Sequence, residues 1–191
     1  MERAQAIRDI KNLQYTYAQY AQFGLWKQMA ALFSSAGVLD NGTDRLRGPA
    51  AIAAFLTNRY GDGHEGLEAG AVNTVIIATP VVNLSVDGRT AKGRWNGMAL
   101  RSDARGHASI EGGVYENDYV KEGGIWKIAD LHFHPLYAGP YETGWTNFGG
   151  KDLPIVPYHF DGDSAGVPIP APRGAPPKSS VPLASLEQRI R

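Results

Sequence analysis

The stretch Gly112-Gly-Val-Tyr-Glu-Asn-Asp-Tyr-Val-Lys-Glu-Gly-Gly-Ile-Trp-Lys-Ile-Ala-Asp-Leu-His-Phe-His134 decides the fold. Aromatic and β-branched residues lie on both sides of Glu122-Gly-Gly, which is typical of two strands joined by a tight turn. Trp126 and Ile128 fall on one side of the second strand. We predict a long antiparallel hairpin late in the chain.

The residues before this hairpin predict helices first and strands afterwards. Apolar residues recur every three or four positions over residues 7–21, and shorter helical patterns follow at 25–33 and after Pro49. Three further strands are predicted, at 38–40, 72–86 and 90–102. Helices followed by a run of antiparallel strands predict the α+β class.

Composition argues against several classes of partner. Nineteen basic and nineteen acidic side chains cancel, which disfavours a nucleic-acid surface, and no apolar run is long enough to span a membrane. The first residues lack the apolar centre of a secretory signal, and the chain has no cysteine. We therefore expect a cytoplasmic protein without disulfides or thiolate metal sites.

Periodic patterns stop near residue 138 of the 191-residue chain. Glycine and proline punctuate the sequence after that point, with aromatic residues scattered among them but no periodic run. We expect one domain at 1–138, followed by a C-terminal arm and tail at 139–191 that covers the pocket of this domain or a neighbouring subunit.

The order of these elements resembles the SnoaL-like branch of the NTF2-like superfamily. The resemblance rests on Ala30-Ala-Leu-Phe33, the Gly48-Pro49 helix start, Val86-Asp-Gly and Trp126-Lys-Ile-Ala, and it covers roughly residues 4–137. It implies a curved sheet wrapped around the N-terminal helices into a cone that holds a small, mostly apolar ligand. That branch includes dehydratases of the scytalone dehydratase type, dehydrochlorinases and cofactor-free lyases, and isomerases and polyketide cyclases share the fold.

The dehydratase and dehydrochlorinase members use an Asp on the first helix to orient a His base on the third strand. Matching Trp26 and the Val86-Asp-Gly turn to the family pattern places Gln22 and Val75 at these two positions. Valine cannot accept a proton, so the resemblance implies that any base lies elsewhere in the cone.

Tyr115, Asn117 and Tyr119 share one face of the first hairpin strand. The resemblance implies that Tyr115 and Asn117 line the cone and hydrogen-bond the substrate. A phenol in an apolar cone can donate a hydrogen bond to a developing oxyanion, so Tyr115 is a candidate catalytic residue. The alternative is that the tyrosines are core aromatics with satisfied hydroxyl groups.

His132 and His134 share one face of the last strand. Neutral imidazole is a natural general base near neutral pH, so either could replace the missing His, with Asp40 orienting it. Alternatively, the histidines pack under the arm or at a subunit contact, and Asp40 caps the turn that follows it. The pair could also begin a metal site, but no spacing assigns a further ligand, so we predict none.

Aromatic and amide side chains complete the predicted binding set. Flat side chains suit a flat ligand, which favours an aromatic or polycyclic substrate. The predicted substrate-binding residues besides Asn117 are Asn41, Tyr15, Gln22, Trp26, Trp95, Asn96, Met98, Phe133 and Tyr141. Residues 137–145 follow the last strand, and the resemblance implies that they form part of a lid over the ligand.

These patterns together predict a cofactor-independent lyase that abstracts a proton from a hydroxylated aromatic or polycyclic small molecule. Elimination, dehydration and C–C cleavage such as deformylation all remain open. The alternatives are an isomerase or cyclase of the same fold, a non-catalytic binder of a hydrophobic ligand, and an assembly module. We expect no cofactor, and a homodimer or homotrimer as the assembly.

Overall fold

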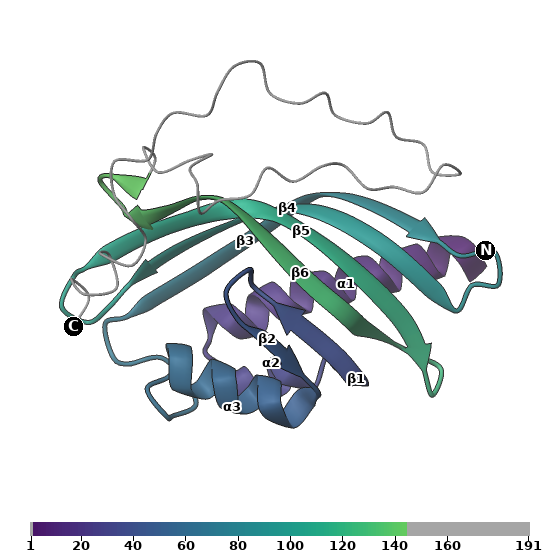
Figure 1. The fold of residues 1–191 in the computed structure, drawn as a ribbon, viewed down its shortest axis with the longest axis horizontal. Helices are drawn as coiled ribbons and strands as arrows, with labels where there is room; N and C mark the ends of the chain where they lie inside the picture. Colours follow the sequence, from purple (N-terminus) through teal and green to yellow (C-terminus); the bar gives the residue numbers. More distant parts are fainter. Residues whose placement is uncertain (1, 145–191) are drawn as a thin grey trace, which may run out of the picture.

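The predicted hairpin is central to the sheet of the computed structural model, which describes residues 2–144 (Figure 1). β5 (Ala108–Glu122) and β6 (Ile125–Pro140) pair antiparallel along their length, with register shifts after Gly112 and Asp118. Gly123 and Gly124 between them both have positive φ, as a tight two-residue turn requires. β4 (Thr90–Ser102) pairs with the other edge of β5 and has the predicted bounds.

Six strands form one mixed sheet in the order β2-β1-β6-β5-β4-β3. β3 (Val72–Leu84) is one edge of the sheet, and β2 (Arg45–Arg47) is the other. β1 (Phe33–Asp40) runs parallel to β6, although the sequence predicted antiparallel strands throughout. This pair is parallel because β1 follows the first two helices and joins the edge of a strand far away in sequence.

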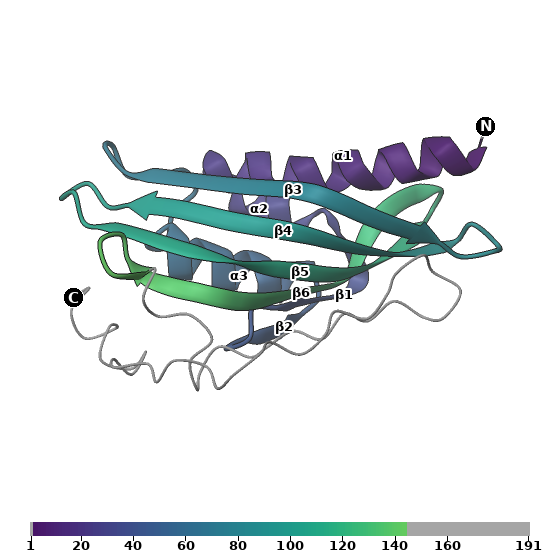
Figure 2. The same cartoon turned by 90° about the horizontal axis from the view of Figure 1, so that it is seen from above.

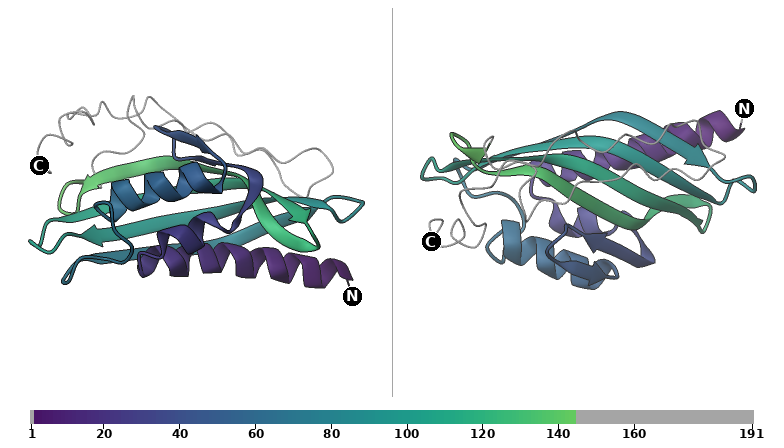
Figure 3. Two further views of the ribbon diagram at one scale, coloured as in Figure 1. Left: turned by 90° about the horizontal axis from the view of Figure 1, so that it is seen from below. Right: turned by 45° about the horizontal axis from the view of Figure 1, so that its top comes forward.

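Three helices lie on one face of the arched sheet (Figures 2 and 3). α1 (Glu2–Gln22) runs beside β3, and α2 (Trp26–Ala30) and α3 (Pro49–Tyr60) cover the strands beyond it. Gly24, with φ of 66°, turns the chain out of α1, and proline begins α3, where its missing N–H is tolerated. The α+β class and the sheet wrapped around N-terminal helices are therefore confirmed.

Alternation along the strands separates two faces of the sheet. The inner face, which carries Trp95, Tyr115 and Leu131, packs toward the helices, and the outer face carries the residues between them, such as Arg94 and Glu116. Trp95 and Leu131 are almost completely buried, so the inner face forms the core together with the apolar side of the helices. The assignment of each strand residue to one face decides which side chains can form a site.

β6 continues to Pro140, past the expected domain boundary at 138. The arm from residue 145 onward lies outside the described residues, so its covering role and most of the lid stay predictions. Within residues 2–144, no helix combines the length and the apolar character needed to cross a membrane.

Candidate functional site

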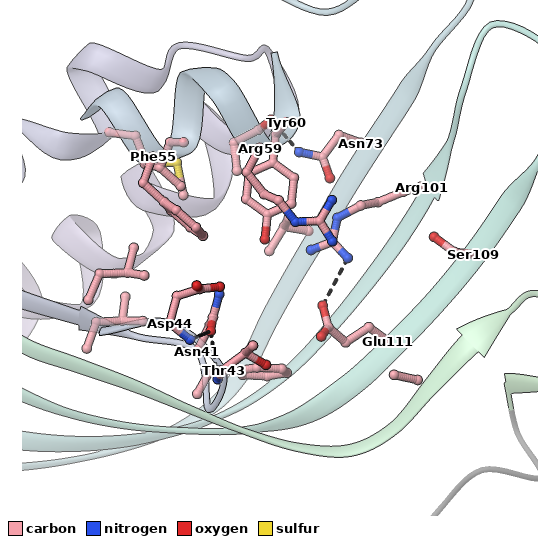
Figure 4. Close-up of a pocket in the computed structure, with 18 of the residues that line it drawn as sticks. Asn41, Thr43, Asp44, Phe55, Arg59, Tyr60, Asn73, Arg101, Ser109 and Glu111 are labelled. Atoms are coloured by element: carbon pink, nitrogen blue, oxygen red, sulfur yellow. Dashed lines mark hydrogen bonds and ion pairs between the residues drawn. The ribbon is translucent and has the colours of Figure 1, made fainter. Parts of the chain in front are cut away.

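A cavity of about 390 Å³ lies between the inner face of the sheet and the helices (Figure 4). A volume of this size suits a small organic molecule. Six aromatic rings line it, and they belong to Tyr17, Trp26, Phe55, Tyr60, Tyr115 and Phe133. The cone is therefore hollow rather than filled with side chains, as the sequence predicted.

An ion pair lies inside this cavity. Arg101 of β4 and Glu111 of β5 both point inward, and the Arg101 Nη1 donates to the Glu111 Oε2 over 2.9 Å (Figure 4). Burial lowers the pKa of Arg101, but the charge and hydrogen bond of Glu111 together with Tyr60 and Tyr115 outweigh it, so the net direction is upward and the guanidinium stays charged. The cavity wall thus combines six aromatic rings with polar side chains, and the Arg101–Glu111 pair is fixed within it.

Tyr115 lies in the middle of the inner face because the neighbouring strand leaves room for its ring. Its ring covers Gly97 of β4, where a Cβ atom would lie only 2.3 Å from the tyrosine Cε2. The ring packs against Phe133 and meets Tyr17 edge-on, with centroid distances of 4.6 and 6.5 Å. Burial, followed by the Glu111 charge, raises the pKa of Tyr115, so the phenol remains protonated and can donate a hydrogen bond.

Tyr60, the last residue of α3, forms the other aromatic centre of the cavity. Its ring stacks at a tilt on Trp26, with centroids 5.7 Å apart. Two guanidinium groups approach the same ring, Arg101 at 5.4 Å and Arg59 at 5.7 Å from its centroid. Burial raises the pKa of Tyr60, with the Arg101 charge opposing it, so this hydroxyl is also protonated.

The positions expected for the family's Asp and His carry neither residue. Val75 lines the cavity, as the predicted match requires, but Gln22 is exposed and the neighbouring Ala21 lines the cavity instead. The side chain of Asn73 donates to the Ala21 carbonyl over 2.8 Å and ties β3 to α1. Neither alanine nor valine can accept a proton, so these two positions supply no general base.

The structure corrects the placement of the two histidines. Leu131 and Phe133 line the cavity, so alternation along β6 turns His132 and His134 to the outer face. Their rings stack on each other there, with centroids 3.9 Å apart. The expectation that one of them supplies the base inside the cone is therefore wrong, because the sheet separates both from the cavity.

Asp40 lies on the outer face with the histidines, so its expected role inside the cone is wrong as well. Its Oδ1 accepts from the Gly42 backbone N–H over 2.9 Å and lies 3.8 Å from the His132 Nε2. Arg45 pairs with its other oxygen over 2.7 Å. Asp40 thus caps the turn, which was the alternative reading, whereas the next residue, Asn41, does line the cavity.

Asn117 and Trp95 face inward but lie beneath α1, away from the cavity. The Asn117 Nδ2 donates to the Gln14 Oε1 over 2.9 Å, and the Trp95 Nε1 donates to the Tyr119 hydroxyl over 2.9 Å. The same hydroxyl donates to the Gln14 Oε1 over 2.8 Å. These four side chains form a buried polar cluster, so the prediction that Asn117 and Trp95 contact substrate is not supported by their placement.

The remaining predicted binding residues divide between the cavity and the surface. Trp26, Phe133 and Asn41 line the cavity. Asn96 and Met98 belong to the outer alternation of β4, and Asn96 donates to Thr79. The side chains outside the cavity wall are Tyr15, which packs edge-on against Trp95, and the exposed Gln22 and Tyr141.

Sequence reasoning missed Arg101, Glu111 and Tyr60 as site residues. A usable signal was present for the first two. Arg101 has the same strand parity as Trp95, and Glu111 has the same parity as Tyr115, so fixing either aromatic on the inner face also places the charge there. Tyr60 ends a short helix, and no periodic pattern marks it as facing a cavity. No group of three or more His, Asp or Glu side chains in residues 2–144 could hold a metal ion.

Comparison with known proteins agrees with this architecture. The chain belongs to the SnoaL-like domain family, whose model matches residues 2–132. No curated protein matches the sequence significantly.

Solved structures share the fold at low sequence identity. A scytalone dehydratase-like protein from Novosphingobium aromaticivorans is 18% identical, with a TM-score of 0.62 over 73% of this chain and 90% of that one. Hexachlorocyclohexane dehydrochlorinase LinA type 2 is 16% identical, with a TM-score of 0.61 over the same shares, 73% and 90%. ActVI-ORFA from Streptomyces coelicolor is 12% identical, with a TM-score of 0.55 over 69% of this chain and 96% of that one.

Proposed function

We propose that this protein is a cofactor-independent lyase that acts on a hydroxylated aromatic or polycyclic small molecule in the cavity. The observation that carries the proposal is the Arg101–Glu111 ion pair inside a cavity lined by six aromatic rings. A carboxylate held in place within hydrogen-bond reach of a bound molecule can act as a general base. The resemblance of the fold to proteins named as a dehydratase and a dehydrochlorinase supports an elimination.

In this proposal Glu111 replaces the family's His as the base. Arg101 holds the carboxylate in one orientation through the 2.9 Å hydrogen bond and remains charged beside it. The same guanidinium has further donors that can face an oxyanion formed on the ligand. Base and oxyanion partner therefore come from adjacent strands, without a histidine.

Tyr115 is the proposed hydrogen-bond donor to the developing oxyanion. Burial raises its pKa, which keeps the phenol protonated throughout the reaction. Its hydroxyl makes no hydrogen bond within residues 2–144, so it is available to a ligand. Donors preorganised in a site that excludes water stabilise negative charge far better than water does.

The proposed step balances without a cofactor or an oxidant. Glu111 takes a proton from the carbon beside a ligand carbonyl, and charge develops on the carbonyl oxygen facing Arg101 and Tyr115. The electron pair then forms a C=C bond as the hydroxyl on the next carbon leaves, and Glu111 returns its proton so that water departs. If Glu111 takes the proton of that hydroxyl instead, its oxygen forms the C=O bond of a small aldehyde as the bond to the carbon beside the ketone breaks. The electron pair passes to the ketone oxygen as an enolate, and Glu111 returns the proton to that carbon.

The outer face of the same strands supplies a matched control for the test. Glu111→Gln should lower turnover of hydroxylated aryl ketones by about 10²–10⁴-fold, the range that a general base contributes. Glu116→Gln, which alters the corresponding pair on the outer face, should leave turnover unchanged. Turnover by Glu111→Gln at the wild-type rate would refute the assignment of the base.

A non-catalytic ligand carrier is the second candidate. The observation that favours it is that Gln22 and Val75 stand at the positions of the family's acid–base pair, and that Val75 lines the cavity whereas Gln22 is exposed. Wild-type protein that binds aryl ketones, as measured by quenching of tryptophan fluorescence, but converts none of them would favour the carrier over the lyase.

A further inference from the structure

Arg59 lines the cavity although the residue is exposed overall, and it has no carboxylate partner within residues 2–144. Its guanidinium carbon lies 5.7 Å from the centroid of the Tyr60 ring. Within residues 2–144 its guanidinium forms no hydrogen bond or ion pair. Arg101, by contrast, is paired with Glu111. Among the described residues, the Tyr60 end of the cavity therefore has two guanidinium groups and one paired carboxylate.

Asp44 also lines the cavity and offsets part of this positive charge. Burial raises the pKa of Tyr60, and Arg101, Glu111 and then Arg59 affect that pKa more strongly than Asp44 does. At the ring itself, the positive charge of Arg59 is the larger influence.

Three phenol groups supply hydrogen-bond donors to the same space. The hydroxyl groups of Tyr17, Tyr60 and Tyr115 have no hydrogen-bond partner within residues 2–144. Burial raises the pKa of each of them, so all three are neutral donors. A ligand with oxygen substituents on a flat ring system would satisfy these donors and pack against the aromatic wall.

We infer that the substrate of the proposed reaction is an aromatic carboxylate whose carboxylate group binds Arg59 beside Tyr60. The planar fork of a guanidinium matches a carboxylate with two parallel hydrogen bonds, and the aromatic walls hold the ring. Arg101 keeps its bond to Glu111, so the anion-binding end and the proton-transfer pair are separate groups. Calling this ligand a substrate rests on the proposed function, whereas the preference of the cavity for a carboxylate can be tested by binding alone.

Binding of two ligands that differ only in charge tests this inference. The probes are 6-hydroxy-2-naphthoate and the uncharged 6-hydroxy-2-naphthamide, titrated into the full chain by calorimetry. The wild type should bind the naphthoate at least about tenfold more tightly, which corresponds to about 1.4 kcal/mol. Arg59→Gln should remove this preference, and Arg59→Lys should retain part of it.

Arg105→Gln is the matched control, because Arg105 is an exposed arginine in a turn that does not line the cavity. It should keep the wild-type preference for the naphthoate. Equal affinity of the wild type for both probes, a preference that survives in Arg59→Gln, or failure to bind either probe would overturn the inference.

A further variant separates this inference from the proposed function. Glu111→Gln should bind the naphthoate at least as tightly as the wild type, because it removes the proposed base and a negative charge but not Arg59. Preference for the naphthoate without turnover of any hydroxylated aryl compound would refute the lyase and leave the anion site standing. Turnover of a hydroxylated aryl compound without a preference for the naphthoate would refute the anion site and leave the proposed lyase standing.

Discussion

Two Arg–Glu pairs join β4 to β5, one on each face of the sheet. Arg101–Glu111 lies on the inner face in the cavity, and Arg94–Glu116 lies on the outer face, where the Glu116 Oε2 is 3.7 Å from the His134 Nε2. The residue types and strands are the same, yet one pair meets a hollow lined by aromatic rings and the other meets polar neighbours. Strand parity, rather than residue type, therefore decides which pair of charges faces the cavity.

Exchanging the two residues within each pair should give the largest difference in activity between the inner and the outer pair. Arg101→Glu combined with Glu111→Arg should lower kcat/KM by at least about 10³-fold, because the base leaves its position and a guanidinium takes its place. Arg94→Glu combined with Glu116→Arg should leave kcat/KM unchanged. Steady-state turnover measures both, with thermal unfolding to show that each variant folds. Equal losses from the two exchanges would contradict a special role for the inner pair.

Two tyrosines of β5 lie on the inner face, and they are expected to contribute differently to turnover and to stability. Tyr115→Phe should lower turnover by about 10-fold or more with little change in stability, because its hydroxyl has no hydrogen bond to lose within residues 2–144. Tyr119→Phe should instead lower the free energy of unfolding by about 1–3 kcal/mol, since its hydroxyl bonds Trp95 and Gln14. Turnover and urea unfolding, measured for both variants, separate the two roles. If both variants lost stability and neither lost turnover, the proposed role of Tyr115 would be contradicted.

Two asparagines, one on each face of the sheet, are expected to differ in how much they contribute to stability. Asn117→Leu should lower the free energy of unfolding by about 1–3 kcal/mol, because it leaves Gln14 and Tyr119 partly unpaired beneath α1. Asn96→Leu on the outer face loses one exposed hydrogen bond to Thr79 and should change stability by less than about 0.5 kcal/mol. Urea unfolding at neutral pH measures both. A larger loss of unfolding free energy for Asn96→Leu than for Asn117→Leu would contradict the expectation that the buried asparagine contributes more to stability.

The smallest effect is expected at Asp40 on the outer face. Burial alone would raise its pKa, but hydrogen bonds from Gly42 and Arg45 and the nearby His132 lower it below the ordinary 3.8. A carboxyl whose pKa is lowered by folding stabilises the fold at pH values above its unfolded-state pKa. This stabilisation is lost as the pH falls through its folded-state pKa.

Asp40→Asn should therefore lower the free energy of unfolding by up to about 1 kcal/mol at neutral pH. The difference from the wild type should disappear as pH falls below 3.8. Chemical unfolding across pH measures it, and Arg45→Gln should reproduce part of it. A difference that grows toward acid pH would mean that the sign is wrong.

The order of elements could be predicted because it depends on local patterns. The 90–102 strand and the Gly123-Gly124 turn are marked by alternation and turn residues, and the structure places both as predicted. The region after Met29 was harder, because the predicted second helix ended at residue 33, whereas Phe33 begins β1. Apolar residues suit a short helix and a short strand equally, so pairing with β6 decides the outcome.

The site was harder to predict than the fold. The alternation of Leu131 and Phe133 with the two histidines is the one sequence signal that places the histidines on the face away from the core. Asn117 shows a different limit, because an inward residue lines the cavity only where no helix covers it. The position of Gln14 over Asn117 is a tertiary fact that one strand's sequence does not contain.

The parallel pairing of β1 with β6 has a consequence for how the protein acquires its cavity. Leu39 pairs with Leu131, and both form part of the cavity wall, so strands from opposite ends of the domain must meet before the hollow exists. Contacts so distant along the chain form slowly, after the local hairpins. A nascent chain that lacks β6 therefore has no enclosed hollow, and ligand capture must wait until the last strand has been synthesised.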